Sequence, residues 1–137
     1  KGGPYEKATS IQDFKGAKIT AQLNTFHYTV IDQIEGVNKQ PAMDNFPAMR
    51  VALESGMIDG YVSERPEGVS ATAANENFAM VEFVDGFETS DDDTAIAVGL
   101  RKDSELTAKI NEILAGISEE ERIEIMDEAI RNQPAAE

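Results

Sequence analysis

Apolar and polar positions alternate along the chain in two periods, which predict strands and helices in turn. The run KITAQL over 18–23 favours a strand, and 25–35 places apolar side chains at the three- and four-residue spacings of an amphipathic helix. Further strands are expected over 57–64, 78–84 and 94–102, and further helices over 45–55, from about Pro66, over 104–117 and over 121–130. Strands alternating with helices imply an α/β fold with a mainly parallel sheet flanked by helices.

Helix start and stop signals separate these elements. Gly16, Gly36 and Gly56 stand where helices are expected to end. Asp44 is the expected N-cap of the helix over 45–55, and SEEE at 118–121 is a capping box that opens the last helix. DGFETSDDD at 85–93 is predicted to be an acidic loop.

Composition narrows the range of partners. The 137 residues are enough for one domain with a core, and 12 basic against 26 acidic residues give a formal charge of −14. That charge repels nucleic acid and anionic lipid, so we expect neither as a partner. Cysteine is absent, so disulfides and thiolate chemistry are excluded. The opening KGGPYEKATS reads like the interior of a protein, so any export signal is expected upstream of it.

The first candidate site is the turn at the end of the strand over 18–23. Backbone N–H groups of the first helical turn lack intrahelical partners, and together with the Thr25 hydroxyl they suit a carboxylate or phosphate. The alternative is that Asn24 or Thr25 simply caps its own helix.

The second candidate site is Ser63-Glu64, which ends the run IDGYVSE. A carboxylate at a strand end accepts hydrogen bonds only, which suits an ammonium group, whereas the alternative is a solvated surface glutamate. In open parallel sheets, ligands bind at the carboxyl ends of strands. The two sites together would suit a zwitterion such as an α-amino acid.

Other polar residues carry weaker signals. His27 is the single histidine, and we favour a surface or supporting position for it over contact with the side chain of a ligand. Asp91, Asp92 and Asp93 lack the spacing of a calcium loop, and Asp59 is expected to cap a neighbouring turn. No metal or cofactor is expected.

Three stretches together resemble the amino-acid-binding proteins of ABC importers (extracellular solute-binding protein family 3, type II periplasmic binding fold). They are SIQDFKGAKITAQLNTFHYTVIDQI, FPAMRVALESGMIDGYVSERPEG and TAIAVGLRKDSELTAKINEIL. The resemblance implies one of two α/β lobes that close on an amino acid. It places the second, ligand-binding lobe at 1–92, a returning hinge strand at 93–102, and C-terminal helices that normally pack on the first lobe at 103–137. The first lobe would lie outside this sequence.

The resemblance also implies roles for individual residues. Asn24, Thr25 and Phe26 match the family's Gly-Thr-x contact with the ligand carboxylate, and Gln22 matches a contact with the ligand side chain. Ser63 and Glu64 match the position whose acidic residue accepts from the α-ammonium. Asn24 replaces the usual glycine, and asparagine tolerates a left-handed backbone. Glu64 replaces the commoner aspartate.

The expected function is therefore substrate binding for an amino-acid ABC transporter, without enzymatic activity. The expected partners are a free amino acid and the membrane permease, in an extracytoplasmic location. The alternatives are a dehydratase-type enzyme that uses Glu64 as general acid, and the sensory domain of a membrane receptor. The apolar stripes of 104–117 and 121–130 are expected to fold back on the lobe, to pair in a homodimer, or to stay exposed.

Overall fold

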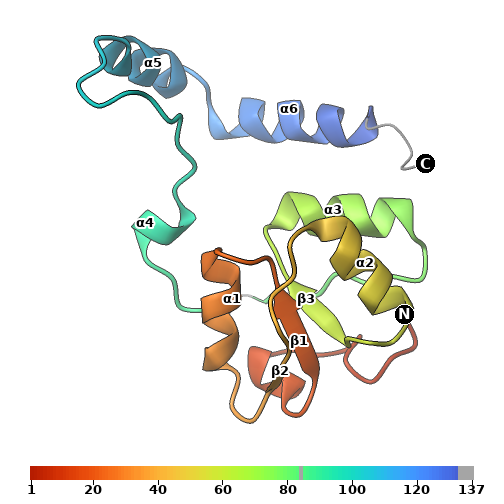
Figure 1. Ribbon diagram of the computed structural model, residues 1–137. Coiled ribbons are helices and arrows are strands. Elements are labelled where there is room, and N and C mark those ends of the chain that lie inside the picture. The colour runs from red at the N-terminus through yellow and green to blue at the C-terminus, as the bar shows by residue number, and fades with distance from the viewer. Residues whose placement is uncertain (84, 133–137) are drawn as a thin grey trace. The chain divides into compact units, whose positions relative to one another are not determined.

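The structure is a computed structural model that describes residues 1–83 and 85–132 (Figure 1). The chain divides into two compact units, Lys1–Asp93 and Thr94–Glu137.

Unit 1 contains a small open sheet of three parallel strands. The strands are β1 (Lys18–Ala21), β2 (Asn38–Lys39) and β3 (Gly60–Val62), in the order β2-β1-β3. The register pairs Ile19 with Lys39 on one side and with Gly60 on the other. The α/β class with a parallel sheet flanked by helices is therefore confirmed.

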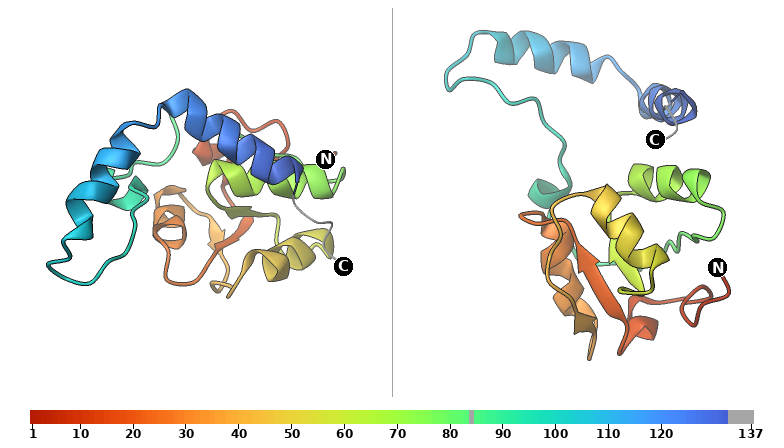
Figure 2. Two further views of the ribbon diagram at one scale, coloured as in Figure 1. Left: turned by 90° about the horizontal axis from the view of Figure 1, so that it is seen from above. Right: turned by 45° about the vertical axis from the view of Figure 1, so that its right-hand side comes forward.

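Helices cover both faces of this sheet. Helix α1 (Phe26–Val30), continued by the 3-10 turn η2 (Ile31–Gln33), lies on one side, and α2 (Phe46–Glu54) and α3 (Arg65–Ala74) lie on the other (Figures 1 and 2). The arrangement follows from the strand order, because the chain passes from β1 to β2 in one direction and from β2 back across β1 to β3 in the other.

The core lies around the central strand. Ile19, Thr20 and Ala21 of β1 are all buried, as expected for a strand that is covered on both faces. Ile19 and Ala21 pack with Ala17 and Ile31, so the odd positions of β1 face η2. The largest of the other fully buried side chains are Met49 and Ile58.

The glycine stop signals were interpreted correctly. The 3-10 turn η1 (Ile11–Phe14) ends before Gly16 at φ +80°, and it begins with a capping box from Ser10 that was not predicted. Gly36 and Gly56 have φ of +70° and +72°, which only glycine adopts without strain.

The predicted N-cap of α2 is wrong by one residue. Asn45, not Asp44, caps the helix, and its side chain accepts a hydrogen bond from the Ala48 N–H at 2.9 Å. The shift is explained by Pro47. If Asp44 were the N-cap, Pro47 would stand at the third helical position, whose backbone N–H donates to the cap side chain. Proline has no backbone N–H and cannot make this bond.

Two predicted strands do not form. Residues 78–83 and 95–101 have no strand structure, and Val84 lies outside the described residues. In the first stretch the backbone forms no strand ladder, but the apolar side chains still pack. Phe78 is buried, and the Phe83 ring meets the Phe14 ring edge-on at 6.0 Å between centroids. The acidic stretch before 94 is also not all loop, because Asp91–Thr94 forms the short helix α4.

Unit 2 carries α5 (Leu106–Ala115) and α6 (Glu119–Arg131). The capping box of α6 is confirmed, since Ser118 accepts from the Glu121 N–H and Glu121 accepts from the Ser118 N–H, each at 3.1 Å. Within unit 2 taken by itself, none of the described residues is buried. Among the described helices, none has the length and apolar character needed to cross a membrane.

Candidate functional site

The strand order creates a switch point between β1 and β3. These neighbours are parallel, and the helices that follow them, α1 and α3, lie on opposite faces of the sheet (Figures 1 and 2). Loops that part in this way leave a crevice outside the carboxyl ends of the strands, where ligands bind in open α/β sheets. The turn 22–26 and Ser63-Glu64 both lie at this edge. The two segments lie close together, because Nε2 of His27, the residue after the turn, is 3.7 Å from Oε2 of Glu64.

The turn after β1 has a left-handed residue at its centre. Asn24 has φ +61°, so asparagine does support the backbone conformation that the sequence analysis assigned to it. The Thr25 side chain makes no cap bond to its own helix. Its hydroxyl instead donates to the Gln22 carbonyl at 2.7 Å and thereby closes the turn. The Thr25 oxygen retains acceptor capacity, whereas its proton is already engaged.

Neighbouring contacts hold the rest of this turn. Gln22 Nε2 donates to the Asp44 carbonyl at 3.1 Å, which joins the turn to the segment that follows β2. The Phe26 ring lies 4.1 Å from the His27 ring, centroid to centroid. Helix α1 has only five residues, so the partial charge at its N-terminus is small and the anion-binding argument is correspondingly weaker than the sequence suggested.

Glu64 is the most accessible charged group of the site. It occupies the N-cap position of α3, its side chain makes no cap bond, and that side chain is 48% exposed. Ser63 is half-buried, and its hydroxyl donates to the Glu64 carbonyl at 3.2 Å. Within the described part of the chain, His27 is the one basic side chain within 4 Å of the Glu64 carboxylate.

The His27 imidazole is largely enclosed, with 15% of its side chain exposed. Burial lowers the pKa of His27 below its usual 6.5, and the Glu64 charge offsets this only in part. The imidazole is therefore neutral at pH 7, and no full positive charge compensates Glu64 there. The edge thus holds a half-exposed carboxylate that can accept from a cationic group.

A second polar cluster, which sequence reasoning missed, joins α2, β3 and α3. Arg50 donates to Glu67 through Nε at 3.0 Å and Nη2 at 2.8 Å, and Nη2 also donates to Ser70 at 3.2 Å. The Tyr61 hydroxyl donates to Glu67 Oε1 at 3.0 Å. Hydrogen bonding to Glu67 raises the pKa of Arg50, and burial, followed by the Glu67 charge, raises the pKa of Tyr61 to about 12.

Nothing in the local sequence marks this cluster, because Arg50 and Glu67 belong to different helices whose mutual packing the periodicity does not specify. Glu67 is 8% exposed, and it lies in the first turn of α3, three residues after Glu64. The cluster therefore holds the start of α3 against β3 and α2.

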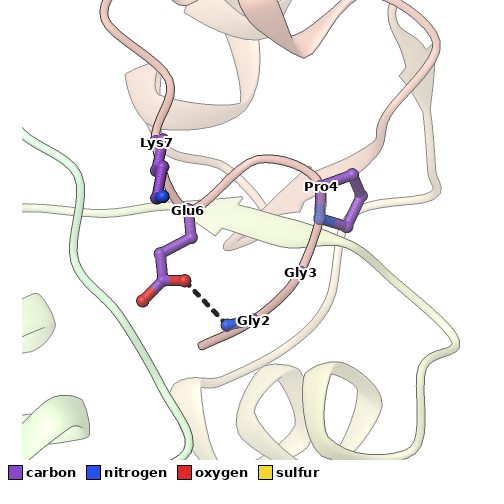
Figure 3. Close-up of a pocket in the computed structure, with 5 residues that line it drawn as sticks. All are labelled: Gly2, Gly3, Pro4, Glu6 and Lys7. Carbon is purple, nitrogen blue, oxygen red and sulfur yellow. Dashed lines mark hydrogen bonds between the residues drawn. The ribbon is translucent and has the colours of Figure 1, made fainter.

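Two other places in unit 1 carry polar side chains. A surface depression of about 330 Å³ is lined by Gly2, Gly3, Pro4, Glu6 and Lys7 (Figure 3). The Glu6 carboxylate in it already accepts from the Gly2 N–H at 2.7 Å, and none of the predicted site residues lines it. Asp59 accepts from the Lys18 N–H at 2.8 Å, so it contacts the first residue of β1 rather than capping a neighbouring turn.

In the part of the chain that the structure describes, no three His, Cys, Asp or Glu side chains gather closely enough to hold a metal ion. No protein-family model, curated protein or solved structure matches this chain.

Proposed function

We propose that unit 1 is the ligand-binding lobe of an extracytoplasmic amino-acid-binding protein with the type II periplasmic binding fold, which delivers its ligand to the permease of an ABC importer. The observation that carries this proposal is the half-exposed Glu64 carboxylate, which lies beside the turn 22–26 at the switch point of the sheet. The sequence resemblance and the parallel sheet support the same assignment.

In this function Glu64 accepts hydrogen bonds from the α-ammonium group of the ligand. A hydrogen bond that involves a charged group contributes about 1.5–3 kcal/mol, and about 1.4 kcal/mol corresponds to a tenfold change in affinity. Replacing Glu64 with glutamine is therefore expected to weaken binding at least tenfold. The ligand carboxylate would meet the backbone N–H groups of the turn, supplemented by groups of the opposite lobe.

Binding between two lobes works by closure, because a ligand that contacts both lobes stabilises the closed state that a permease recognises. Residues 93–102 would form the hinge strand and 103–137 would pack on the other lobe. The exposed alternating side chains of Ile96, Val98 and Leu100 support this, since a strand with one apolar face is suited to pair and pack. One lobe supplies part of the contacts, so the affinity of this chain alone is expected to be weak.

The test is an NMR titration of this chain with each of the twenty amino acids. We expect at least one amino acid to shift the amide resonances of residues 23–27 and 63–65 at millimolar concentration. For Glu64→Gln, the apparent affinity obtained from these shifts should be at least tenfold lower. The matched control is Glu76→Gln, which neutralises an exposed glutamate of the same unit and should leave binding unchanged. The proposal is overturned if no amino acid perturbs these amides, or if the perturbation survives Glu64→Gln.

A further inference from the structure

His27 is the internal group that reaches the carboxylate of the candidate site. It projects from the first turn of α1, and its Nε2 atom lies 3.7 Å from Oε2 of Glu64, which stands at the start of α3. The imidazole is 15% exposed and the carboxylate 48% exposed, so one side of Glu64 faces His27 while the other remains open to solvent. A ligand ammonium and a charged imidazole would both need this carboxylate.

The charge on His27 is controlled by few neighbours. Burial disfavours the imidazolium, and Glu64 is the one charged group among the described residues whose field acts appreciably on it. The Phe26 ring of the same helix lies 4.1 Å from the imidazole, centroid to centroid. Two basic groups of unit 1 are paired elsewhere, since Arg65 Nε, next in sequence to Glu64, binds Glu82 and Lys39 Nζ binds Asp32, each at 2.9 Å.

We propose that protonated His27 competes with the ammonium group of the ligand for Glu64, so that the site captures an amino acid near neutral pH and releases it as the pH falls. The inference rests on the proposed function and adds a regulatory role for a residue beside the site. Competition is effective because the imidazole is tethered at the carboxylate, which gives it a high local concentration. If the charged imidazole excludes the ligand completely, the apparent Kd rises about tenfold for each pH unit below the pKa of His27.

The first part of the test needs no ligand. His27 is the single histidine of the chain, so its imidazole resonances can be followed by NMR without ambiguity. In the unmodified chain they should titrate below pH 6.5. Glu64→Gln removes the stabilising charge, so the pKa of His27 should fall further, whereas the control Glu76→Gln should leave it unchanged. An identical titration in the Glu64→Gln variant would show that the two groups are uncoupled and would overturn the inference.

The second part measures binding of glycine, which presents the head of an amino acid without a side chain, at pH 7 and pH 5. We expect the apparent affinity of the unmodified chain to fall several-fold at pH 5, and that of His27→Gln to be the same at both values, whatever its level. A dispersed amide spectrum at pH 5 checks that both proteins remain folded. Equal affinity of the unmodified chain at the two pH values refutes the pH coupling alone. Absence of glycine binding in every variant at both pH values overturns the inference, whereas the proposed function fails only if none of the twenty amino acids perturbs the amides of residues 23–27 and 63–65.

Discussion

Loss of the Glu67 charge is expected to destabilise unit 1 more than loss of any exposed glutamate. The Glu67 carboxylate is 8% exposed and accepts two hydrogen bonds from Arg50 and one from Tyr61, at 2.8–3.0 Å. Glu67→Gln keeps the shape of the side chain but leaves the Arg50 guanidinium without its counter-charge. Breaking a buried ion pair from one side costs about 3–5 kcal/mol. Arg50 is 24% exposed and keeps some hydration, so we expect about 2–4 kcal/mol here.

Urea unfolding followed by circular dichroism measures this effect. With a slope of about 2 kcal/mol per molar urea, in the middle of the range for small proteins, the midpoint should fall by about 1–2 M while the slope stays constant. The control is Glu82→Gln, since Glu82 and Arg65 are 56% and 65% exposed and pair through one 2.9 Å contact. An exposed pair contributes about 0–1 kcal/mol. The reasoning fails if the two variants lose the same stability, or if Glu67→Gln loses less than about 1 kcal/mol.

Four further outcomes are expected. Ile31 is 0% exposed, so Ile31→Ala should cost about 2–5 kcal/mol in urea unfolding. Asn24 has φ +61°, so Asn24→Val should cost about 1–2 kcal/mol in the same assay, and Asn24→Gly should be nearly neutral. Ser118→Ala removes the N-cap of α6 and should destabilise that helix by about 1 kcal/mol, measured by amide hydrogen exchange. Burial lowers the pKa of folded His27, so the unfolded chain binds its proton more readily. Stability should therefore fall as the pH drops through about 6.5 and level off below the folded pKa, and His27→Gln should remove this component from a pH series of urea midpoints.

Elements with local causes were predictable from the sequence. The capping box at Ser118 and Glu121 and the left-handed turn at Asn24 depend on residues within a few positions of each other. The α/β class followed from the alternation of strand-like and helix-like stretches. In a parallel sheet the carboxyl ends of all strands lie at one edge, so β1 and β3 end at the same edge. A shared edge for the two candidate sites was thus predictable from the sequence, whereas the strand order that makes β1 and β3 neighbours was not.

Elements with non-local causes were not predictable. The runs 78–84 and 94–102 have the composition of strands, but a strand also requires a hydrogen-bonded neighbour, which periodicity does not identify. In the first run, Phe78 and Phe83 are held by side-chain packing instead. At the site, the sequence indicated that Thr25 bears a hydroxyl but not that this hydroxyl donates to the Gln22 carbonyl. The pairing of Arg50 with Glu67 depends on which faces of α2 and α3 meet, and no short motif encodes that.

The buried cluster and the candidate site are mechanically linked through α3. Glu67 is fixed by Arg50 and Tyr61, and it lies within one helical turn of Glu64, so the backbone that carries the exposed carboxylate cannot move without disturbing a buried ion pair. A ligand that binds Glu64 therefore has to order only the side chain, because the backbone is already ordered, and this lowers the entropic cost of association. A chain with 26 acidic residues has many exposed carboxylates. Glu64 differs from them in being anchored one turn before a buried pair, at the switch point of a parallel sheet and within reach of the single histidine.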